Sequence, residues 1–173
     1  MFFALLDNVR SAYNVGSIFR TSDCAGIDGI IITGYTAYPP HPKVEKTSLG
    51  AEDSVPWIYY RDPLQALVGL KTSTPPPDAV SSNWRFSPTQ LAGCTLVACE
   101  LTPQADNLYT QPLTSDMILI FGHEVDGVQP GLLELADTHL RIPMFGHKDS
   151  LNVASSYAIV AYEYVRQRHF AKP

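Results

Sequence analysis

The chain has 173 residues, of which 45% are hydrophobic and 17% charged, so we expect one soluble domain with a single substantial core. Its formal net charge of −5 argues against a nucleic-acid binder with a wholly basic surface, although a local patch of Lys and Arg stays compatible with it. Three cysteines without C-x-x-C spacing argue against a disulfide framework and a zinc site, and no apolar run approaches the ~18 residues of a membrane span, so we expect a cytoplasmic protein without a membrane anchor.

Short apolar runs alternate with segments of helical periodicity along the chain. Strands are expected at residues 2–6, 29–33, 57–60, 94–99, 117–121 and 139–142. Helices are expected at residues 14–25, 63–70, 130–136 and 150–168, with Gly26 as the stop of the first and Asp62 as the cap of the second. Two proline-rich stretches, 34–46 and 71–92, are expected to be irregular loops.

This order of elements predicts an α/β fold. Because each strand is almost wholly apolar, we expect a mainly parallel sheet with helices on both faces. Ligands of such sheets bind beyond the carboxyl ends of the strands. Polar residues of this chain gather there, directly after Leu6, Cys99, Phe121 and Ile142. The sequence therefore predicts a binding site at that edge of the sheet.

The first polar segment is an N-x-G-x-x-x-R pattern, formed by Asn14, Gly16 and Arg20 where a loop enters a helix. A spacing of six residues does not put Asn14 and Arg20 on one helix face, so they would converge only if Asn14 lies in the cap or loop. The Arg guanidinium is planar and permanently charged, which suits a phosphate. The alternative is an Asn14 N-cap and a solvated Arg20.

The second segment follows the apolar run 117–121 and carries Gly122, Glu124 and Gly127. Glycines there would permit a tight turn and the close approach of a ligand to the backbone. The spacing matches neither G-x-G-x-x-G nor a P-loop. The alternative is an ordinary strand-to-helix turn with a surface Glu124.

The third segment, residues 141–159, joins a strand end, a polar loop and a helix start. Ser150 stands at the expected N-cap of the last helix, and Asn152 follows in its first turn. A loop that ends at a helix N-terminus offers unpaired N–H groups to a ligand, so the segment predicts a site built largely of backbone. A purely structural role for both side chains is the alternative.

Together, these segments resemble the three motifs of the SpoU-type (TrmH-like) RNA ribose 2′-O-methyltransferases of the SPOUT superfamily. Asn14, Gly16 and Arg20 match the first motif, and residues 121–127 match the second, F-G-x-E-x-x-G. Residues 142–144 and 150–153 match the third, I-P-M…S-L-N-V. The match covers nearly the whole chain in the right order, and it resembles a single catalytic SPOUT domain, 1–173, without a separate RNA-recognition domain.

The resemblance implies an α/β domain whose C-terminal segment, from about Asp116 to Pro173, forms a trefoil knot. It implies S-adenosylmethionine as methyl donor, no required metal, and a ribose 2′-hydroxyl of tRNA or rRNA as acceptor. Backbone of three loops would hold the donor, at Leu101, Gly122, Gly127, Ile142, Met144 and Leu151.

The resemblance also implies catalytic roles for five side chains. Arg20 would clamp the phosphate beside the target ribose and stabilise charge, and Glu124 would orient Arg or Asn groups. Asn14 would hold the first motif's loop, while Ser150 and Asn152 would position the ribose and the knot loop.

Family members are homodimers, so Arg20 would be able to act in the partner's site. The apolar face of the last helix, at Tyr157, Ala161 and Tyr164, is a candidate interface; core packing is its alternative. A local basic surface for RNA phosphates would consist of Arg10, Arg20, Lys43, Lys46 and Arg141.

Two other functions stay open from the sequence. One is a non-catalytic knotted RNA-binding or assembly module, and the other is a small-molecule binding protein for an adenine-containing ligand. The joint presence of Arg20, Glu124, Ser150 and Asn152 favours the enzyme.

Overall fold

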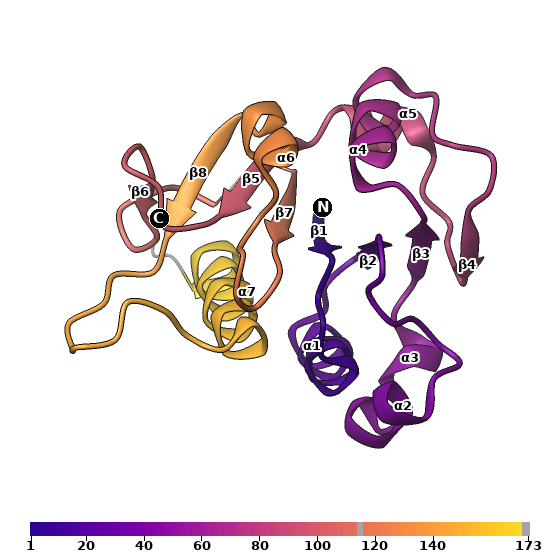
Figure 1. Ribbon diagram of the computed structural model, residues 1–173, viewed down its shortest axis with the longest axis horizontal. Helices are drawn as coiled ribbons and strands as arrows, with labels where there is room; N and C mark the ends of the chain where they lie inside the picture. Colours follow the sequence, from indigo (N-terminus) through magenta and orange to yellow (C-terminus); the bar gives the residue numbers. More distant parts are fainter. Residues whose placement is uncertain (114–115, 171–173) are drawn as a thin grey trace.

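The computed structural model describes residues 1–113 and 116–170 and contains one sheet with the strand order β4-β3-β2-β1-β7-β5-β8-β6 (Figure 1). The six predicted strands are present, as β1 (Phe2–Asp7), β2 (Gly29–Thr33), β3 (Trp57–Tyr60), β5 (Thr95–Cys99), β7 (Met117–Phe121) and β8 (Thr138–Arg141). Two short strands were not predicted, β4 (Val80–Ser82) and β6 (Asp106–Asn107). Within the described sheet only β3 and β4 pair antiparallel, so the predicted α/β class with a mainly parallel sheet is confirmed.

Successive residues of a strand point to opposite faces of the sheet, so an almost wholly apolar strand has two faces to bury. Helices cover both faces of this sheet. Phe2, Ala4 and Leu6 of β1 pack into one core with α1 (Ala12–Ala25), α2 (Pro42–Ser48), α3 (Ala51–Ser54) and α7 (Val153–Phe170). Phe3 and Leu5 pack into a second core with α4 (Pro63–Thr72), α5 (Pro88–Ala92) and α6 (Pro130–Leu135). Figure 1 shows the two groups of helices on opposite sides of the strands.

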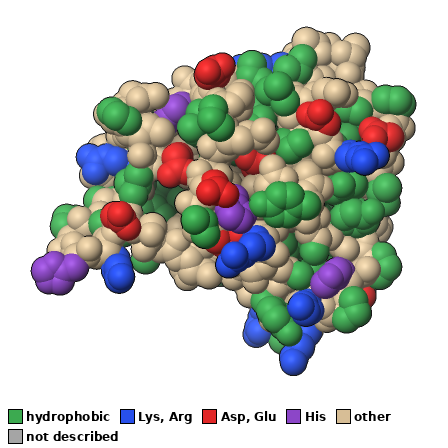
Figure 2. All heavy atoms as spheres, in the orientation of Figure 1, with side chains coloured by type: hydrophobic (Ala, Val, Ile, Leu, Met, Phe, Trp, Pro, Cys, Tyr) green, Lys and Arg blue, Asp and Glu red, His purple; other side chains and the backbone are tan. Residues whose placement is uncertain are grey.

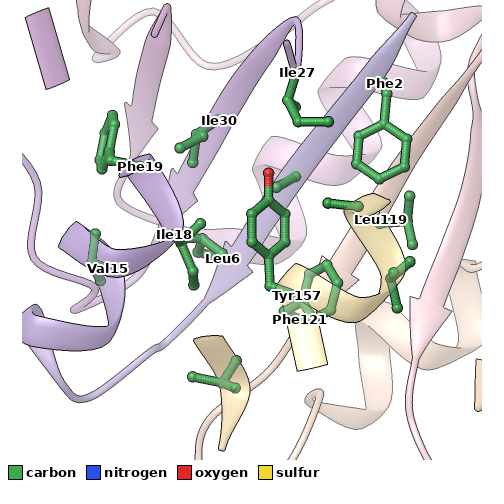
Figure 3. Packing of buried hydrophobic residues seen from close by; sticks show 14 of the residues in the cluster. Phe2, Leu6, Val15, Ile18, Phe19, Ile27, Ile30, Leu119, Phe121 and Tyr157 are labelled. Carbon is green, nitrogen blue, oxygen red and sulfur yellow. The ribbon is translucent and has the colours of Figure 1, made fainter. Parts of the chain in front are cut away.

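The last helix, α7, contributes a large aromatic side chain to the first core. Tyr157 is fully buried among Leu6, Ile18 and Phe121, and its ring lies edge-on to Phe121 at 5.4 Å (Figure 3). Its hydroxyl oxygen lies 2.6 Å from that of Ser22, which gives the buried O–H group a partner. The interface predicted at Tyr157 and the neighbouring apolar positions Ala161 and Tyr164 is therefore wrong, because these residues are buried against α1 and the sheet.

Both proline-rich stretches contain regular elements, so the prediction of irregular loops was wrong. Pro42 occupies the first turn of α2, where its fixed φ suits a helix and its missing N–H loses no intrahelical bond. In the second stretch, β4 pairs with β3, and Ser87 forms a capping box with Gln90 at the start of α5. The Phe86 ring lies 4.8 Å from that of Phe3, which fixes the stretch to the second core.

Two kinds of feature are absent from residues 1–113 and 116–170. No helix in these ranges has the length and apolar character that a bilayer span requires. Nor does any group of three or more His, Cys, Asp and Glu side chains there lie close enough together to hold a metal ion.

Candidate active site

The loops after β5, β7 and β8 and the start of α7 surround one pocket of about 240 Å³. This volume lies just below the ~300–1,000 Å³ that is usual for sites of drug-sized ligands. The lining includes all six residues predicted to hold a cofactor, namely Leu101, Gly122, Gly127, Ile142, Met144 and Leu151. Apolar side chains of β8 and α7 form one part of the lining, and Glu100, Glu124 and Asp126 give it carboxylates. In Figure 2 acidic side chains gather on the body of the molecule beside the projecting segment that precedes α7.

The turn after β7 is closed so tightly that only glycine fits at its start. The backbones of His123 and Gly127 exchange two N–H···O hydrogen bonds of 2.9 Å. A Cβ atom on Gly122 would lie 2.2 Å from both the carbonyl carbon of Gly127 and the amide nitrogen of Val128. Gly122 therefore allows two stretches of backbone to touch at the rim of the pocket.

Gly127 has a positive φ of 73° and also makes room for a side chain from another loop. A Cβ atom there would lie 2.3 Å from Oε2 of Glu100. That oxygen accepts a hydrogen bond of 3.0 Å from the N–H of Val128, and Oε1 accepts one of 2.9 Å from the N–H of Leu101. Glu100 was missed by the sequence reasoning; its signal was an acidic residue directly after the apolar run 94–99.

Glu124 joins the second motif to the first. Its Oε2 accepts a hydrogen bond of 2.8 Å from the N–H of Arg10, and its Oε1 accepts bonds of 2.9 Å from the N–H of Ser11 and 2.8 Å from the amide of Asn14. Burial raises the pKa of Glu124, but these hydrogen bonds outweigh it and hold the pKa below its ordinary value. Glu124 is therefore an ionised carboxylate that orients Asn14 and the loop before α1.

The third motif joins this network through Asn152. Its amide nitrogen donates to Oδ1 of Asn14 at 3.2 Å, while its own Oδ1 accepts from the N–H groups of Ala154 and Ser155 at 2.9 and 3.4 Å. Asn152 is thus the N-cap of α7, and the predicted Ser150 cap was wrong. Ser150 lies earlier in the loop, lines the pocket, and donates to Asp149 at 3.4 Å. One chain of hydrogen bonds, from Glu124 through Asn14 to Asn152, now links all three motifs.

Asn14 and Arg20 lie in one continuous helix. Ser11 caps α1 by accepting from the N–H of Asn14, so an Asn14 N-cap was wrong and Asn14 stands inside the first turn. Arg20 is exposed on α1 and is outside the pocket lining. Gly16 serves helix packing, since a Cβ there would lie 2.1 Å from Oγ1 of Thr47 on α2.

Two further titratable groups lie near the pocket. Asp7, at the end of β1, is 1% exposed, and burial raises its pKa although Gln129 and Asn8 donate hydrogen bonds that lower it. Burial, followed by the nearby charge of Glu100, raises the pKa of the Cys99 thiol, which is free and lines the pocket. Cys99 is therefore neutral at physiological pH and unsuited to be a nucleophile.

Among the other predicted basic residues, Arg141 lines the pocket and donates from Nε to the carbonyl of Ala105 at 3.1 Å. Lys43 lies on α2 with its ammonium group 5.8 Å from the ring centre of Tyr13 on α1. The predicted basic surface therefore spans at least two regions, the pocket rim and the α1–α2 face.

Solved structures of proteins named as methyltransferases share this fold. The SpoU methyltransferase AviRb from Streptomyces viridochromogenes, in complex with the cofactor AdoMet, superposes with a TM-score of 0.80 at 27% identity, over 98% of this chain and 58% of that one. An AdoMet-bound rRNA methyltransferase from Sinorhizobium meliloti gives a TM-score of 0.78 at 27% identity, over 99% of this chain and 57% of that one.

Similarity in sequence points the same way. A tRNA (guanosine(18)-2′-O)-methyltransferase from Aquifex aeolicus is 28% identical over 165 residues, which are 94% of this chain and 67% of that protein. The chain thus spans between about half and two thirds of the length of these relatives. The model of the SpoU rRNA methylase family matches residues 1–76 and 79–162. This chain belongs to the SpoU rRNA methylase family.

Proposed function

We propose that this chain is an RNA methyltransferase that transfers a methyl group from S-adenosylmethionine to a ribose 2′-hydroxyl of tRNA or rRNA. The observation that carries the proposal is the hydrogen-bonded chain Glu124–Asn14–Asn152, which joins the three motifs beside a single pocket. Family membership and the AdoMet-bound neighbours support the same reading.

The pocket fits the methyl donor chemically. Leu140, Ile142 and Met144 offer an apolar surface for an adenine ring, and the glycine-lined turn after β7 exposes backbone to a ligand. The carboxylates of Glu100, Glu124 and Asp126 favour a positively charged ligand over a neutral one. When bound, S-adenosylmethionine would supply an electrophilic methyl group on a sulfonium.

The chain's own residues would then position the acceptor. Glu124 has both oxygens engaged by N–H donors and a lowered pKa, so its proposed role is to fix Asn14 rather than to accept a proton. Ser150, at the pocket lining, would orient the ribose, and Asn152 would hold the start of α7 against Asn14. Asn14 would hold the turn after β7 and the start of α7 in a fixed relative position, through its hydrogen bonds to Glu124 and Asn152.

Arg20 would clamp the phosphate beside the target ribose, because its guanidinium is bidentate and permanently charged. Asn14 and Arg20 are six positions apart in one helix, which turns the two side chains about 120° apart around the axis. Arg20 therefore points away from the side of α1 on which Asn14 contacts Glu124 and Asn152. We propose a homodimer in which Arg20 serves the partner's pocket.

We also propose that the segment from about Asp116 to Pro173 forms a trefoil knot, of which residues 171–173 lie outside the described part of the chain. Support comes from the sheet order, in which β7 lies between β1 and β5 while β8 returns to the far side of β5. The loops after β5, β7 and β8 meet around one pocket, as a knotted cup would require.

The test compares Arg20→Ala with Arg85→Ala. The second variant is the matched control, because it also removes one exposed arginine, in the proline-rich stretch 71–92. Sites of 2′-O-methylation are mapped in total RNA from a deletion strain and its parent, and the RNA that lacks a mark is used as substrate. Arg20→Ala should bind S-adenosylmethionine in calorimetry like the wild type and lose at least ~100-fold in transfer, whereas Arg85→Ala should keep both.

Three results would count against the proposal. An identical methylation profile in the deletion strain would favour a non-catalytic RNA-binding module. Binding of ATP without any binding of S-adenosylmethionine would reject the methyl-donor pocket. Full turnover by Arg20→Ala would reject the phosphate clamp.

A further inference from the structure

Glu100 is a carboxylate that the known motifs leave out, yet it is built firmly into the pocket. It directly follows β5, and its backbone N–H donates to the carbonyl of Leu140 on β8 at 3.1 Å. Its side chain lines the pocket and is fixed at both oxygens, by the N–H of Leu101 at 2.9 Å and by that of Val128 at 3.0 Å. The group is therefore held in one orientation by backbone from two loops.

The carboxylate keeps capacity for a ligand. An ionised carboxylate can accept about four hydrogen bonds, two at each oxygen. Within the described residues each oxygen of Glu100 accepts one, so each has a second acceptor position to offer. Glu124 differs, because three N–H donors from the α1 side already converge on it.

The absence of a side chain at Gly127 belongs to the same arrangement. A Cβ at that position would overlap Oε2 of Glu100, at 2.3 Å. Glycine is favoured at position 127 for two reasons: its positive φ of 73°, and the space that the Glu100 carboxylate occupies. The turn after β7 thus leaves room for the Glu100 carboxylate, of which each oxygen accepts one hydrogen bond and can accept a second.

We infer that Glu100 accepts hydrogen bonds from the cis-diol of a ribose, that of the adenosine part of the methyl donor. Two adjacent oxygens meet two adjacent hydroxyls, one bond each. The inference rests on the proposed function, since it assigns a subsite within the same pocket. Its chemistry is hydrogen bonding to a charged acceptor, and no proton is transferred.

The position of Glu100 favours the diol over the ammonium group of the methionine part. Through its backbone Glu100 is joined to Leu140, next to the apolar lining of Ile142 and Met144 that would take the adenine. The ribose is attached directly to the adenine, whereas the ammonium group lies at the far end of the ligand. Glu124 is instead bound by the side-chain amide of Asn14 from α1.

The experiment is a chemical double-mutant cycle measured by calorimetry. Wild type and Glu100→Gln are each titrated with S-adenosylhomocysteine, with its 2′-deoxy and 3′-deoxy analogues, and with 5′-methylthioadenosine. Glu134→Gln, the same substitution at an exposed position of α6, is the matched control. Thermal unfolding of each variant verifies that it is folded.

Wild type should bind each deoxy analogue about 10- to 100-fold more weakly than S-adenosylhomocysteine, as for a lost bond to a charged group. Glu100→Gln should weaken S-adenosylhomocysteine and 5′-methylthioadenosine by a similar factor, and its preference for the diol should largely disappear. Glu134→Gln should behave as the wild type. This pattern requires a direct contact, because a loosened loop would weaken every ligand alike.

Three outcomes overturn the inference. Equal losses for S-adenosylhomocysteine and its deoxy analogues would make Glu100 only a brace for the loop. A loss for S-adenosylhomocysteine without a loss for 5′-methylthioadenosine would assign Glu100 to the ammonium group instead. Failure of the wild type to bind any of these ligands would reject the proposed methyl-donor pocket, and the ribose subsite with it.

Discussion

The tight turn after β7 allows one substitution to be predicted in detail, Gly122→Ala. The added methyl would lie 2.2 Å from backbone atoms of Gly127 and Val128, and contacts below 3.0 Å are not tolerated, so the two strands of the turn must separate. Separation would stretch both 2.9 Å hydrogen bonds between His123 and Gly127. Overpacking costs about 1–3 kcal/mol and each of the two lost hydrogen bonds about 0.5–1.5 kcal/mol, so we expect about 2–6 kcal/mol less stability.

The matched control is Gly146→Ala, in the loop before α7, where an added Cβ would meet no atom within 4 Å. Urea unfolding should show a large fall in the midpoint for Gly122→Ala and almost none for Gly146→Ala. Because the same turn lines the pocket, Gly122→Ala should also bind S-adenosylmethionine weakly and lose about 100-fold in methyl transfer, as for a displacement near 1 Å.

Equal unfolding midpoints for the two alanine variants would refute the reasoning about backbone contact. A destabilised Gly122→Ala variant that still binds S-adenosylmethionine with wild-type affinity would separate the turn from the pocket. In that case the lining contributed by residues 122–127 would not contact the donor.

Two further predictions concern the network between the motifs. Asn152→Ala removes the N-cap of α7 and should lower stability by about 1 kcal/mol, while Ser150→Ala should change it by less than about 0.5 kcal/mol; similar falls in the thermal midpoint for both would contradict the assigned cap. Glu124 has a folded pKa below its ordinary value of 4.5, so its stabilisation is complete above pH 4.5 and is lost as the pH falls through the folded value. The difference in urea midpoint between wild type and Glu124→Gln should therefore shrink from pH 7 to pH 3, and a constant difference would argue against the linkage.

Much of the sheet was accessible from the sequence because its strands are continuous apolar runs. Strands 29–33, 57–60 and 117–121 begin and end where predicted, since each is an almost wholly apolar run flanked on both sides by a polar residue, proline or glycine. The short strand β6 was missed because two residues carry no pattern, and it exists only by pairing with β8. Pro42 misled the prediction because a proline suits both a loop and the first turn of a helix.

The sequence predicted which residues lie at the candidate site better than it predicted their hydrogen bonds. All six predicted cofactor residues line one pocket, because the ends of parallel strands meet at one edge of the sheet. Ser150 and Asn152 are both good caps, and only the path of the preceding loop decides that Asn152 is used. Glu100 could not be distinguished from a surface acid, because its meaning depends on the space left by Gly127 in a distant loop.

The central position of β1 has a consequence for how the chain is made. β1 leaves the ribosome shortly before β2 and can pair with it early, but its other neighbour, β7, begins only at Met117. At about 5–20 residues per second, synthesis of the intervening ~110 residues takes roughly 5–20 s. During that interval the half-sheet of β1, β2 and β3 has an apolar open edge, the kind of surface that invites misassembly. Folding of this protein is therefore tied to the pace of translation and to any chaperone that covers nascent strands.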